Sequence, residues 1–269
     1  MNGSGLPLWM SPDNLPGRRD GILGSLPEAV LFDLDDTIFD HALTCRAALG
    51  CLRREHEFLR RRPLRDLWME YSRLLEAVHP AVVAGFLDLT AARQERFRRL
   101  AAFCGVRVSD GEAASLSRTY RSHYQRLRRP VPGVRRVLQR LHGRTVVGVV
   151  TNNQVAEQEE KLSFLGVREL VDLLVISEGV GVSKPDPRIF EIALDRASAE
   201  SSEAVMVGDS WSNDVLGARA AGIRAVWFNR FGAPNPDPAA VVELDSFRSI
   251  RRVQQALSND GPGPRAQLR

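Results

Sequence analysis

Two patterns of hydrophobic and polar positions alternate along most of the chain. Short apolar runs, typical of buried strands, lie at residues 29–33, 145–150, 172–177, 204–208 and 224–228. Helical spacing follows at residues 154–165, from Pro187 and from about Ser212. Strands that alternate with helices predict βαβ units and a parallel sheet, to which residues 240–246 add a last strand.

Residues 41–129 show helical spacing alone. Interruptions at Pro63, His79–Pro80 and Gly105 predict four helices, and Ser109 with Glu112 forms a capping-box pattern at the start of the last. The strand before residue 41 should join the same sheet as the later strands. We therefore predict an α/β core of residues 28–40 and 130–252, with residues 41–129 as a helical insertion.

The two ends of the chain have a different composition. Residues 1–27 are rich in Pro, Gly, Asn and Ser, which predicts a flexible N-terminal arm. Residues 253–269 are predicted to be a flexible C-terminal tail, although a short helix is expected to run through Ala256. No stretch reaches the roughly 18 uncharged apolar residues of a membrane-spanning helix, and the first residues lack the apolar run of a signal peptide. We expect a cytoplasmic protein without a membrane partner.

Composition narrows the class of protein. With 43% apolar and 26% charged residues among 269, the chain has the values of a folded globular protein rather than a disordered one. Residues 41–129 hold 18 arginines against 9 acids. Because the acids are interleaved at helical spacings, we interpret these arginines as a solvated helix face and expect no nucleic-acid partner. The three cysteines show no metal-binding or disulfide spacing.

Lysine is unusually scarce. The 37 basic residues include only two lysines, Lys161 and Lys184. Because the compact ammonium and the planar guanidinium do different jobs, a lysine retained in this chain is a candidate for chemistry that needs a primary amine. Lys184, just before the helix at Pro187, is the one to which we assign such a role.

Polar residues gather where the predicted strands end. They are Asp33 to Thr37, Thr151 to Asn153, Ser183 to Pro185, and Gly208 to Asp214. In an open parallel sheet, ligands bind at the carboxyl ends of the strands. Carboxylates, a hydroxyl and a lysine at one edge suit phosphoryl transfer, which needs a nucleophile, a cation and a proton donor.

The aspartates of the first strand end are candidates for two different tasks. Asp33 and Asp35 are two residues apart, so they can reach one centre while differing in environment, with one ionised and the other carrying a proton. Several clustered carboxylates would repel one another without a hard cation, and oxygen ligands suit Mg²⁺, to which Asp209 is the natural third contributor. Asp36 is interpreted as a residue of the turn.

The segments VLFDLDDT, VVTNN, SKPDP and VGDSWSND, in this order, resemble the four signature motifs of the haloacid dehalogenase (HAD) superfamily. The resemblance covers residues 28–40 and 130–252, and the insertion is placed like the C1-type helical cap of that superfamily. It implies a Rossmann-like parallel sheet core with an inserted cap. A more general similarity points to the branch with pyrimidine 5′-nucleotidases and N-acylneuraminate-9-phosphatases.

The resemblance also implies a role for each matching residue. Asp33 would attack phosphorus, Asp35 would protonate the leaving oxygen and then activate water, and Lys184 would offset charge on nucleophile and phosphoryl. Thr151 would bind the phosphoryl group, assisted by Asn152. The implied Mg²⁺ set is Asp33, Asp35 through its main-chain carbonyl, Asp209, and Asp214, which would hold a metal-bound water or Lys184.

These implications lead to one functional hypothesis. We expect a Mg²⁺-dependent phosphatase of a small phosphorylated metabolite, such as a nucleoside monophosphate or a phosphosugar, working as a monomer or homodimer. The cap arginines Arg93 and Arg96 are expected to select among esters. A sugar phosphomutase and a non-catalytic interaction module on the same fold remain as alternatives. A dehalogenase would leave Asp35 and Asp209 without a task, and a phosphonatase would need a cap lysine that is absent.

Overall fold

A six-stranded parallel sheet forms the centre of the molecule, in a computed structural model that describes residues 25–83, 86 and 88–258. The strands are β1 (Ala29–Phe32), β2 (Val146–Thr151), β3 (Leu173–Ile176), β4 (Ala204–Gly208), β5 (Arg224–Phe228) and β6 (Val242–Leu244). Their order in the sheet is β3-β2-β1-β4-β5-β6. The predicted α/β class and parallel sheet are therefore confirmed, and β1 lies at the centre, between β2 and β4.

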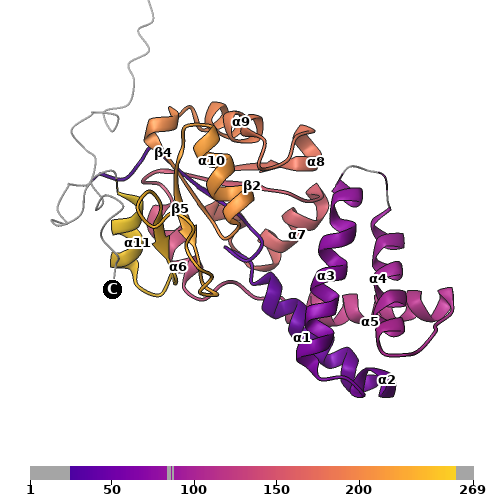
Figure 1. Ribbon diagram of the computed structural model, residues 1–269. Helices are drawn as coiled ribbons and strands as arrows, with labels where there is room; N and C mark the ends of the chain where they lie inside the picture. The colour runs from indigo at the N-terminus through magenta and orange to yellow at the C-terminus, as the bar shows by residue number, and fades with distance from the viewer. Residues whose placement is uncertain (1–24, 84–85, 87, 259–269) are drawn as a thin grey trace, which may run out of the picture.

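Helices cover both faces of the sheet. They are α6 (Val134–Leu141), α7 (Val155–Phe164), α8 (Ser177–Val180), α9 (Pro187–Ala197), α10 (Gly217–Ala220) and α11 (Ile250–Leu257), with short 3₁₀ turns at Arg168–Leu170 and Ser201–Glu203. In β1, Val30 and Phe32 pack into the hydrophobic core under α6, α7 and α11, whereas Ala29 and Leu31 pack into the core under α9 and α10 (Figure 1). Burial on both faces explains why the strand is apolar throughout.

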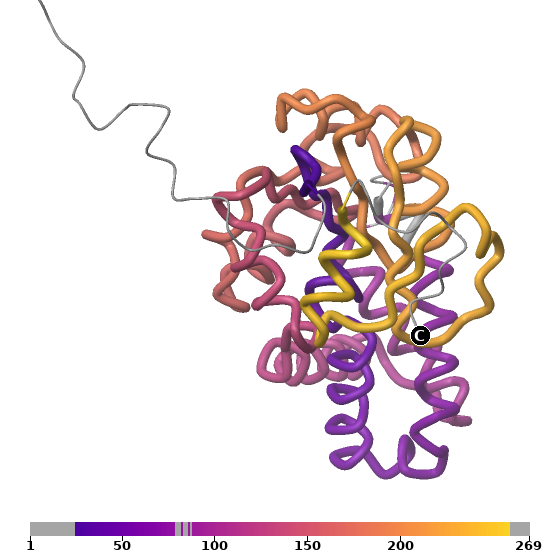
Figure 2. The backbone as a smooth tube through the Cα atoms, turned by 90° about the vertical axis from the view of Figure 1, so that its left-hand side faces the viewer, coloured from indigo at the N-terminus to yellow at the C-terminus, as the bar shows by residue number. Residues whose placement is uncertain are grey.

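The insertion is a bundle of helices beside this core. Its helices are α1 (His41–Glu55), α2 (Glu57–Arg60), α3 (Leu64–Val83), α4 (Leu89–Phe103) and α5 (Asp110–Leu127). Figures 1 and 2 show the bundle projecting from one end of the sheet. The predicted capping box is present at α5, where Ser109 and Glu112 bond each other's backbone. The break expected at His79–Pro80 does not occur, because the proline lies in the last turn of α3 and removes only one hydrogen bond there.

The C-terminal tail starts later than the sequence suggested. Helix α11 continues to Leu257, and Val253, Ala256 and Leu257 are buried, so residues 253–257 belong to the core. Arg224 of β5 fastens the end of the helix by donating to the carbonyl oxygens of Ala256 and Leu257, at 2.8 and 2.6 Å. The remainder of the predicted tail, and residues 1–24 of the predicted arm, lie outside the described residues. No helix in the described part of the chain combines the length and apolar character needed to cross a membrane.

Candidate active site

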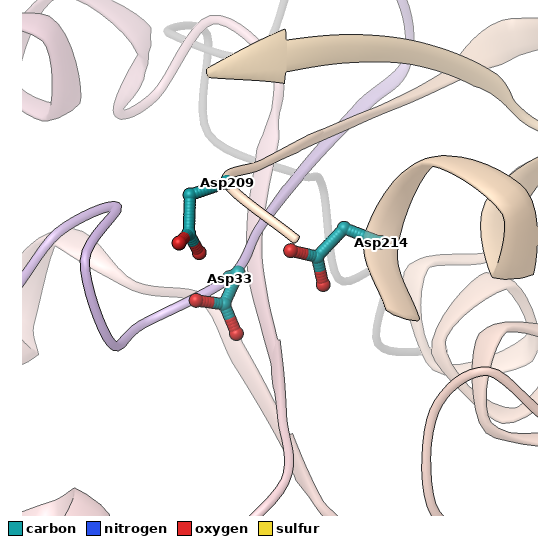
Figure 3. Close-up of side chains that lie close together, drawn as sticks. All are labelled: Asp33, Asp209 and Asp214. Atoms are coloured by element: carbon teal, nitrogen blue, oxygen red, sulfur yellow. The ribbon is translucent and has the colours of Figure 1, made fainter. Parts of the chain in front are cut away.

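Three carboxylates meet at the carboxyl edge of the two central strands. Asp33 follows β1 and its N–H donates to Val207 of β4 at 2.9 Å, so the sheet pairing continues to the residue that carries the side chain. Asp209 follows β4, and Asp214 lies in the π-helical turn Trp211–Leu216 that comes next. One oxygen from each carboxylate lies within 4.8 Å of the others (Figure 3). The topology has thus brought Asp33 together with two residues, Asp209 and Asp214, that lie 176 and 181 positions further along the chain.

Lys184 joins two of these carboxylates. Its Nζ donates to Asp33 Oδ1 and to Asp214 Oδ1, at 2.6 Å each, and to the carbonyl oxygen of Val150 at 2.9 Å. The side chain is 3% exposed. Burial alone would lower the pKa of Lys184, but Asp214 and Asp33 outweigh it and raise the pKa, so the ammonium is charged at neutral pH.

The carboxylate of Asp214 packs closely against the backbone of Gly208. A Cβ on Gly208 would lie 2.3 Å from Cγ of Asp214, so a side chain at position 208 would displace the carboxylate. The other Asp214 oxygen accepts from the N–H of Ser210 at 2.9 Å. Trp227 of β5 donates its indole N–H to the carbonyl oxygen of Asp209 at 2.8 Å. Trp227 therefore holds the loop that carries Asp209.

The cluster carries more negative charge than Lys184 neutralises. Burial has the largest effect on Asp33 and raises its pKa. Lys184 lowers that pKa and repulsion from Asp214 raises it, so that the pKa of Asp33 is about 7. Burial and the neighbouring Asp33 and Asp214 raise the pKa of Asp209 to about 9. Carboxylates that repel one another in this way offer the oxygen donors that Mg²⁺ prefers. The residues present therefore fit a divalent cation among Asp33, Asp209 and Asp214.

The carboxylate of Asp35 lies outside this cluster, in a different environment. Both of its oxygens accept from Nζ of Lys161, at 2.6 and 2.7 Å, and Gln158 Nε2 lies 3.2 Å from Oδ2. His41 Nδ1 lies 3.7 Å from Oδ1. Burial would raise the pKa of Asp35, but Lys161 and then His41 outweigh it and lower the pKa to about 2. Two aspartates two residues apart thus have opposite pKa shifts.

The sequence analysis missed Gln158 and Lys161. Both come from α7, both are buried, and their spacing of three residues places them on the same face of the helix. Gln158 also donates to Thr151 Oγ1 at 2.7 Å, so one side chain links the end of β2 to Asp35. The scarcity of lysine was a signal for Lys161 as much as for Lys184. Gln158 had no comparable signal, because its role depends on the packing of α7.

Asn152 is used differently from what the resemblance implies. Its Nδ2 donates to the main-chain carbonyl of Lys184 at 2.9 Å, and its Oδ1 accepts from the Lys184 N–H at 2.8 Å. This pair of bonds holds the loop that carries the lysine against the end of β2. The side chain of Asn152 therefore positions the backbone of Lys184.

Asp36 belongs to the turn, as the sequence suggested. The residue has a φ of 64°, in the left-handed region that aspartate tolerates better than most residues. Its Oδ1 accepts from the N–H of Ala42 at 2.8 Å, in the first turn of α1, and from Arg230 at 2.6 Å. The side chain thus ties the turn after β1 to the start of the insertion.

A cleft of about 960 Å³ opens above these residues, and the insertion forms part of its wall. Its lining includes the carboxylate cluster and Lys184 from the core together with Leu75 and Glu76 from α3. Glu157 of α7 connects the two parts, because Arg93 of α4 and Arg121 of α5 both donate to it, at 2.8 and 2.6 Å. The insertion is therefore placed as a cap over the carboxyl edge of the sheet.

Comparison with known proteins now identifies the family. The family model described as haloacid dehalogenase-like hydrolase matches residues 27–222. The chain belongs to the haloacid dehalogenase-like hydrolases. The HAD hydrolase YfnB from Bacillus subtilis, solved with magnesium bound, has the same fold, with a TM-score of 0.68 at 22% identity over 86% of this chain and 99% of that one.

Two curated relatives of this HAD hydrolase carry phosphatase names. The ribulose-1,5-bisphosphate 5-phosphatase of Halopiger xanaduensis is 30% identical over 87% of this chain and 96% of that protein. The pyrimidine 5′-nucleotidase YjjG of Escherichia coli is 36% identical over 48% of this chain, and the match spans little more than half, 56%, of that protein. Family and relatives together support a hydrolase of phosphoric monoesters.

The raised pKa values predict how the protein's stability would respond to Mg²⁺ bound at the carboxylate cluster. Without metal, Asp33 and Asp209 keep protons that unfolded carboxylates lose near pH 4, so the free energy of unfolding falls as pH rises through about 7 and then 9. Mg²⁺ bound by these carboxylates would compete with those protons, so the stabilisation that it provides would grow over the same pH window. We expect the gain in Tm on adding Mg²⁺, measured by calorimetry, to be larger at about pH 9 than at about pH 6.

Two variants test whether this gain comes from the cluster. Asp209→Asn should lose the Mg²⁺-dependent gain in Tm, whereas Asp195→Asn, the same change at an exposed position of α9, should keep it. Equal gains at both pH values, or a full gain in Asp209→Asn, would show that the cation binds elsewhere.

A second prediction concerns Lys161. Replacing Lys161 with Met removes the largest influence that lowers the pKa of Asp35, so that pKa should rise by about 1–3 units, the usual effect of an opposite charge at contact distance. The measurement is a ¹³C NMR titration of the side-chain carboxyl groups, with the Asp35 resonance assigned from Asp35→Asn. Arg140→Met, which removes an exposed cation on α6, is the matched control and should leave that resonance unchanged. An unmoved titration in Lys161→Met contradicts the assignment.

Proposed function

We propose that this protein is a Mg²⁺-dependent phosphatase that hydrolyses a small phosphorylated metabolite through an aspartyl phosphate on Asp33. One observation carries the proposal: the buried pairing of Lys184 with Asp33 and Asp214, at 2.6 Å each, beside the carboxylate of Asp209. A carboxylate nucleophile next to a fixed cation, with two more carboxylates for a divalent ion, is the equipment that phosphoryl transfer needs.

The first half-reaction transfers the phosphoryl group to the protein. A carboxylate oxygen of Asp33 attacks phosphorus, and the bond to the leaving oxygen breaks with its electron pair remaining on that oxygen. Asp35 is ionised before substrate binds, because of Lys161. We therefore assign the required proton to the ester itself, which enters as a monoanion, gives its proton to Asp35 and receives it back on the leaving oxygen.

The second half-reaction releases phosphate. Asp35, ionised again, takes a proton from water while the water oxygen attacks the phosphorus of the phosphoaspartate. The acyl phosphate bond breaks and its electrons return to Asp33, which restores the carboxylate. The proton on Asp35 then passes to the released phosphate, so that Asp35 is ionised again. Lys161 keeps Asp35 in its ionised form, which is the form that can accept the proton. Lys184 balances the charge of Asp33 before and after the transfer.

Mg²⁺ held by Asp33, Asp209 and Asp214 would supply positive charge that offsets the negative charge of the phosphoryl oxygens. Thr151 and Lys184 would contact the same group from the ends of the neighbouring segments. The main-chain carbonyl of Asp35 remains the further ligand that the family resemblance implies. The Asp35 side chain is not assigned to the metal, because Lys161 occupies both of its oxygens.

The other activities considered account for the residues less completely. A dehalogenase has no need of the acidic cluster of Asp209 and Asp214 or of an acid at Asp35. A non-catalytic interaction module gives no reason to bury Lys184 between two carboxylates. A phosphomutase keeps the same set of residues, so the fate of the phosphoryl group distinguishes it: a mutase returns phosphate to the sugar, whereas a phosphatase releases it to water.

The role of Asp33 gives a direct test. Asp33→Asn preserves the shape of the side chain but removes the attacking charge, so phosphate release from para-nitrophenyl phosphate should fall by roughly 10⁴-fold or more. Asp195→Asn, on the surface of α9, should retain the activity of the parent. Substantial turnover by Asp33→Asn, together with phosphoaspartate trapped on another residue, would disprove the assignment.

The role of Asp35 predicts a different defect. Asp35→Asn should still accept a phosphoryl group from 2,4-dinitrophenyl phosphate, whose leaving group needs no proton, but should lose about 10²–10⁴-fold in the water step. A burst of dinitrophenol followed by slow turnover, with phosphoenzyme visible by mass spectrometry, is the expected result. If alkyl and dinitrophenyl esters lose activity equally and no phosphoenzyme accumulates, Asp35 does not transfer protons.

A further inference from the structure

A smaller cavity of about 140 Å³ adjoins the active-site cleft on the side of the cap. Its wall comes from α1, α3, α4 and α5 of the cap and from α7 and the strand-end loops of the core. The cavity and the cleft share lining residues: His41, Leu75, Asn153, Ser177 and Glu178. A group attached to a phosphate in the cleft therefore has a space to enter, and that space is smaller than the roughly 300–1,000 Å³ of pockets for drug-sized ligands.

Arg96 lines this cavity without an acidic partner. The residue is 6% exposed, and among the described residues no carboxylate lies within ion-pair distance of its guanidinium. Its Nη1 donates to the hydroxyl of Tyr71 at 2.8 Å, and the guanidinium lies 5.2 Å from the centre of the same ring. Its Nε is buried without an acceptor in the described part of the chain.

The other cations at the cavity have partners. Arg93 and Arg121 both bind Glu157, and Lys161 binds Asp35. The sequence analysis treated Arg93 and Arg96 alike, as selectors of the ester. The structure separates them, because Arg93 connects the cap to the core through Glu157, whereas the charge of Arg96 is balanced by no protein group among the described residues.

An unpaired buried cation is costly, and an anionic ligand removes that cost. Nη1 donates to Tyr71 and the buried Nε has no acceptor among the described residues, so the guanidinium has N–H donors left for the oxygens of a carboxylate. One unpaired arginine balances one negative charge. A second phosphate group, which carries between one and two charges at neutral pH, would exceed it.

We propose that the substrate's leaving group carries a carboxylate that binds Arg96, so that the preferred substrates are phosphate monoesters of small hydroxy acids. The cavity's aromatic side chains, which include Tyr71, Phe97, Tyr120 and Tyr124, surround the carbon skeleton of that group. This inference rests on the proposed phosphatase function, because it identifies the part of the substrate that remains after the phosphoryl group has left.

The test compares two esters that differ at one position. 3-Phosphoglycerate carries a carboxylate where glycerol 3-phosphate carries a hydroxymethyl group. With the full chain and Mg²⁺, kcat/KM should favour 3-phosphoglycerate by about 30-fold or more, the effect of a buried charge pair. Propane-1,3-diol bisphosphate tests a second phosphate. A preference for this bisphosphate, or equal use of the first two esters, overturns the carboxylate assignment.

Variants on α4 connect the preference to Arg96. Arg96→Gln should bring the ratio of the two kcat/KM values to within about threefold of one, and Arg96→Lys should restore part of the ratio. Arg99→Gln, on the same helix but exposed and paired with Glu95, is the matched control and should keep the parent's ratio. A preference that survives in folded Arg96→Gln, with folding checked by its Tm, disproves the role of Arg96.

A binding measurement separates this inference from the proposed function. Asp33→Asn with Mg²⁺ should bind 3-phosphoglycerate about 30-fold more tightly than glycerol 3-phosphate by calorimetry, and the added Arg96→Gln change should abolish the difference. If the parent hydrolyses no ester while this difference is present, the proposed function fails and the carboxylate site stands. If hydrolysis occurs and the two ligands bind equally, the carboxylate site fails and the proposed function stands.

Discussion

The active site depends on one buried ammonium placed between two carboxylates. Lys184 lies 2.6 Å from both Asp33 and Asp214, and without it the burial of those two acids beside Asp209 would be far more unfavourable. The requirement extends into the backbone: Asn152 clamps the loop that carries Lys184, and Gly208 leaves room for Asp214. The ends of three strands are therefore connected through the position of one nitrogen atom.

The two lysines of the chain divide the aspartates into two groups. Lys184 serves a cluster that retains excess negative charge, so Asp209 keeps a raised pKa and a divalent cation is favoured there. Lys161 faces Asp35 alone and holds it ionised. Asp33 and Asp35, two positions apart in the chain, thus have two different electrostatic environments. In this arginine-rich chain, both sites use the compact cation that fits between closely spaced oxygens.

The cap is joined to the core by charge as well as by the chain. Glu157 lies on α7, the helix that also carries Gln158 and Lys161, and it accepts from Arg93 and Arg121 of the cap. Helix α7 therefore contacts both Asp35 and the cap. This arrangement links the position of the cap to the environment of Asp35, and it encloses the cavity that Arg96 lines.

The sequence alone determined the class of fold, the strands and the main acidic positions. Buried parallel strands must be apolar and their carboxyl ends must share an edge, so Asp33, Lys184 and Asp209 were recognisable from local pattern and order. Helix α11 extends past the predicted start of the C-terminal tail, because the packing of its apolar residues outweighs the composition of the segment. Helix α3 continues through the predicted break, because one proline removes only one hydrogen bond.

The tertiary structure decided the partners. The scarcity of lysine marked Lys161 but not its partner, and Gln158 carried no signal of its role, because an ion pair between residues 126 positions apart depends on how α7 packs against the sheet. Packing of the cap likewise leaves Arg96 without an acidic partner among the described residues. The same packing places Asn152 within hydrogen-bond distance of the main chain of Lys184, and Lys161 within hydrogen-bond distance of Asp35. Residue type and order set which groups reach the edge of the sheet, and only three-dimensional proximity sets the charge that each group meets there.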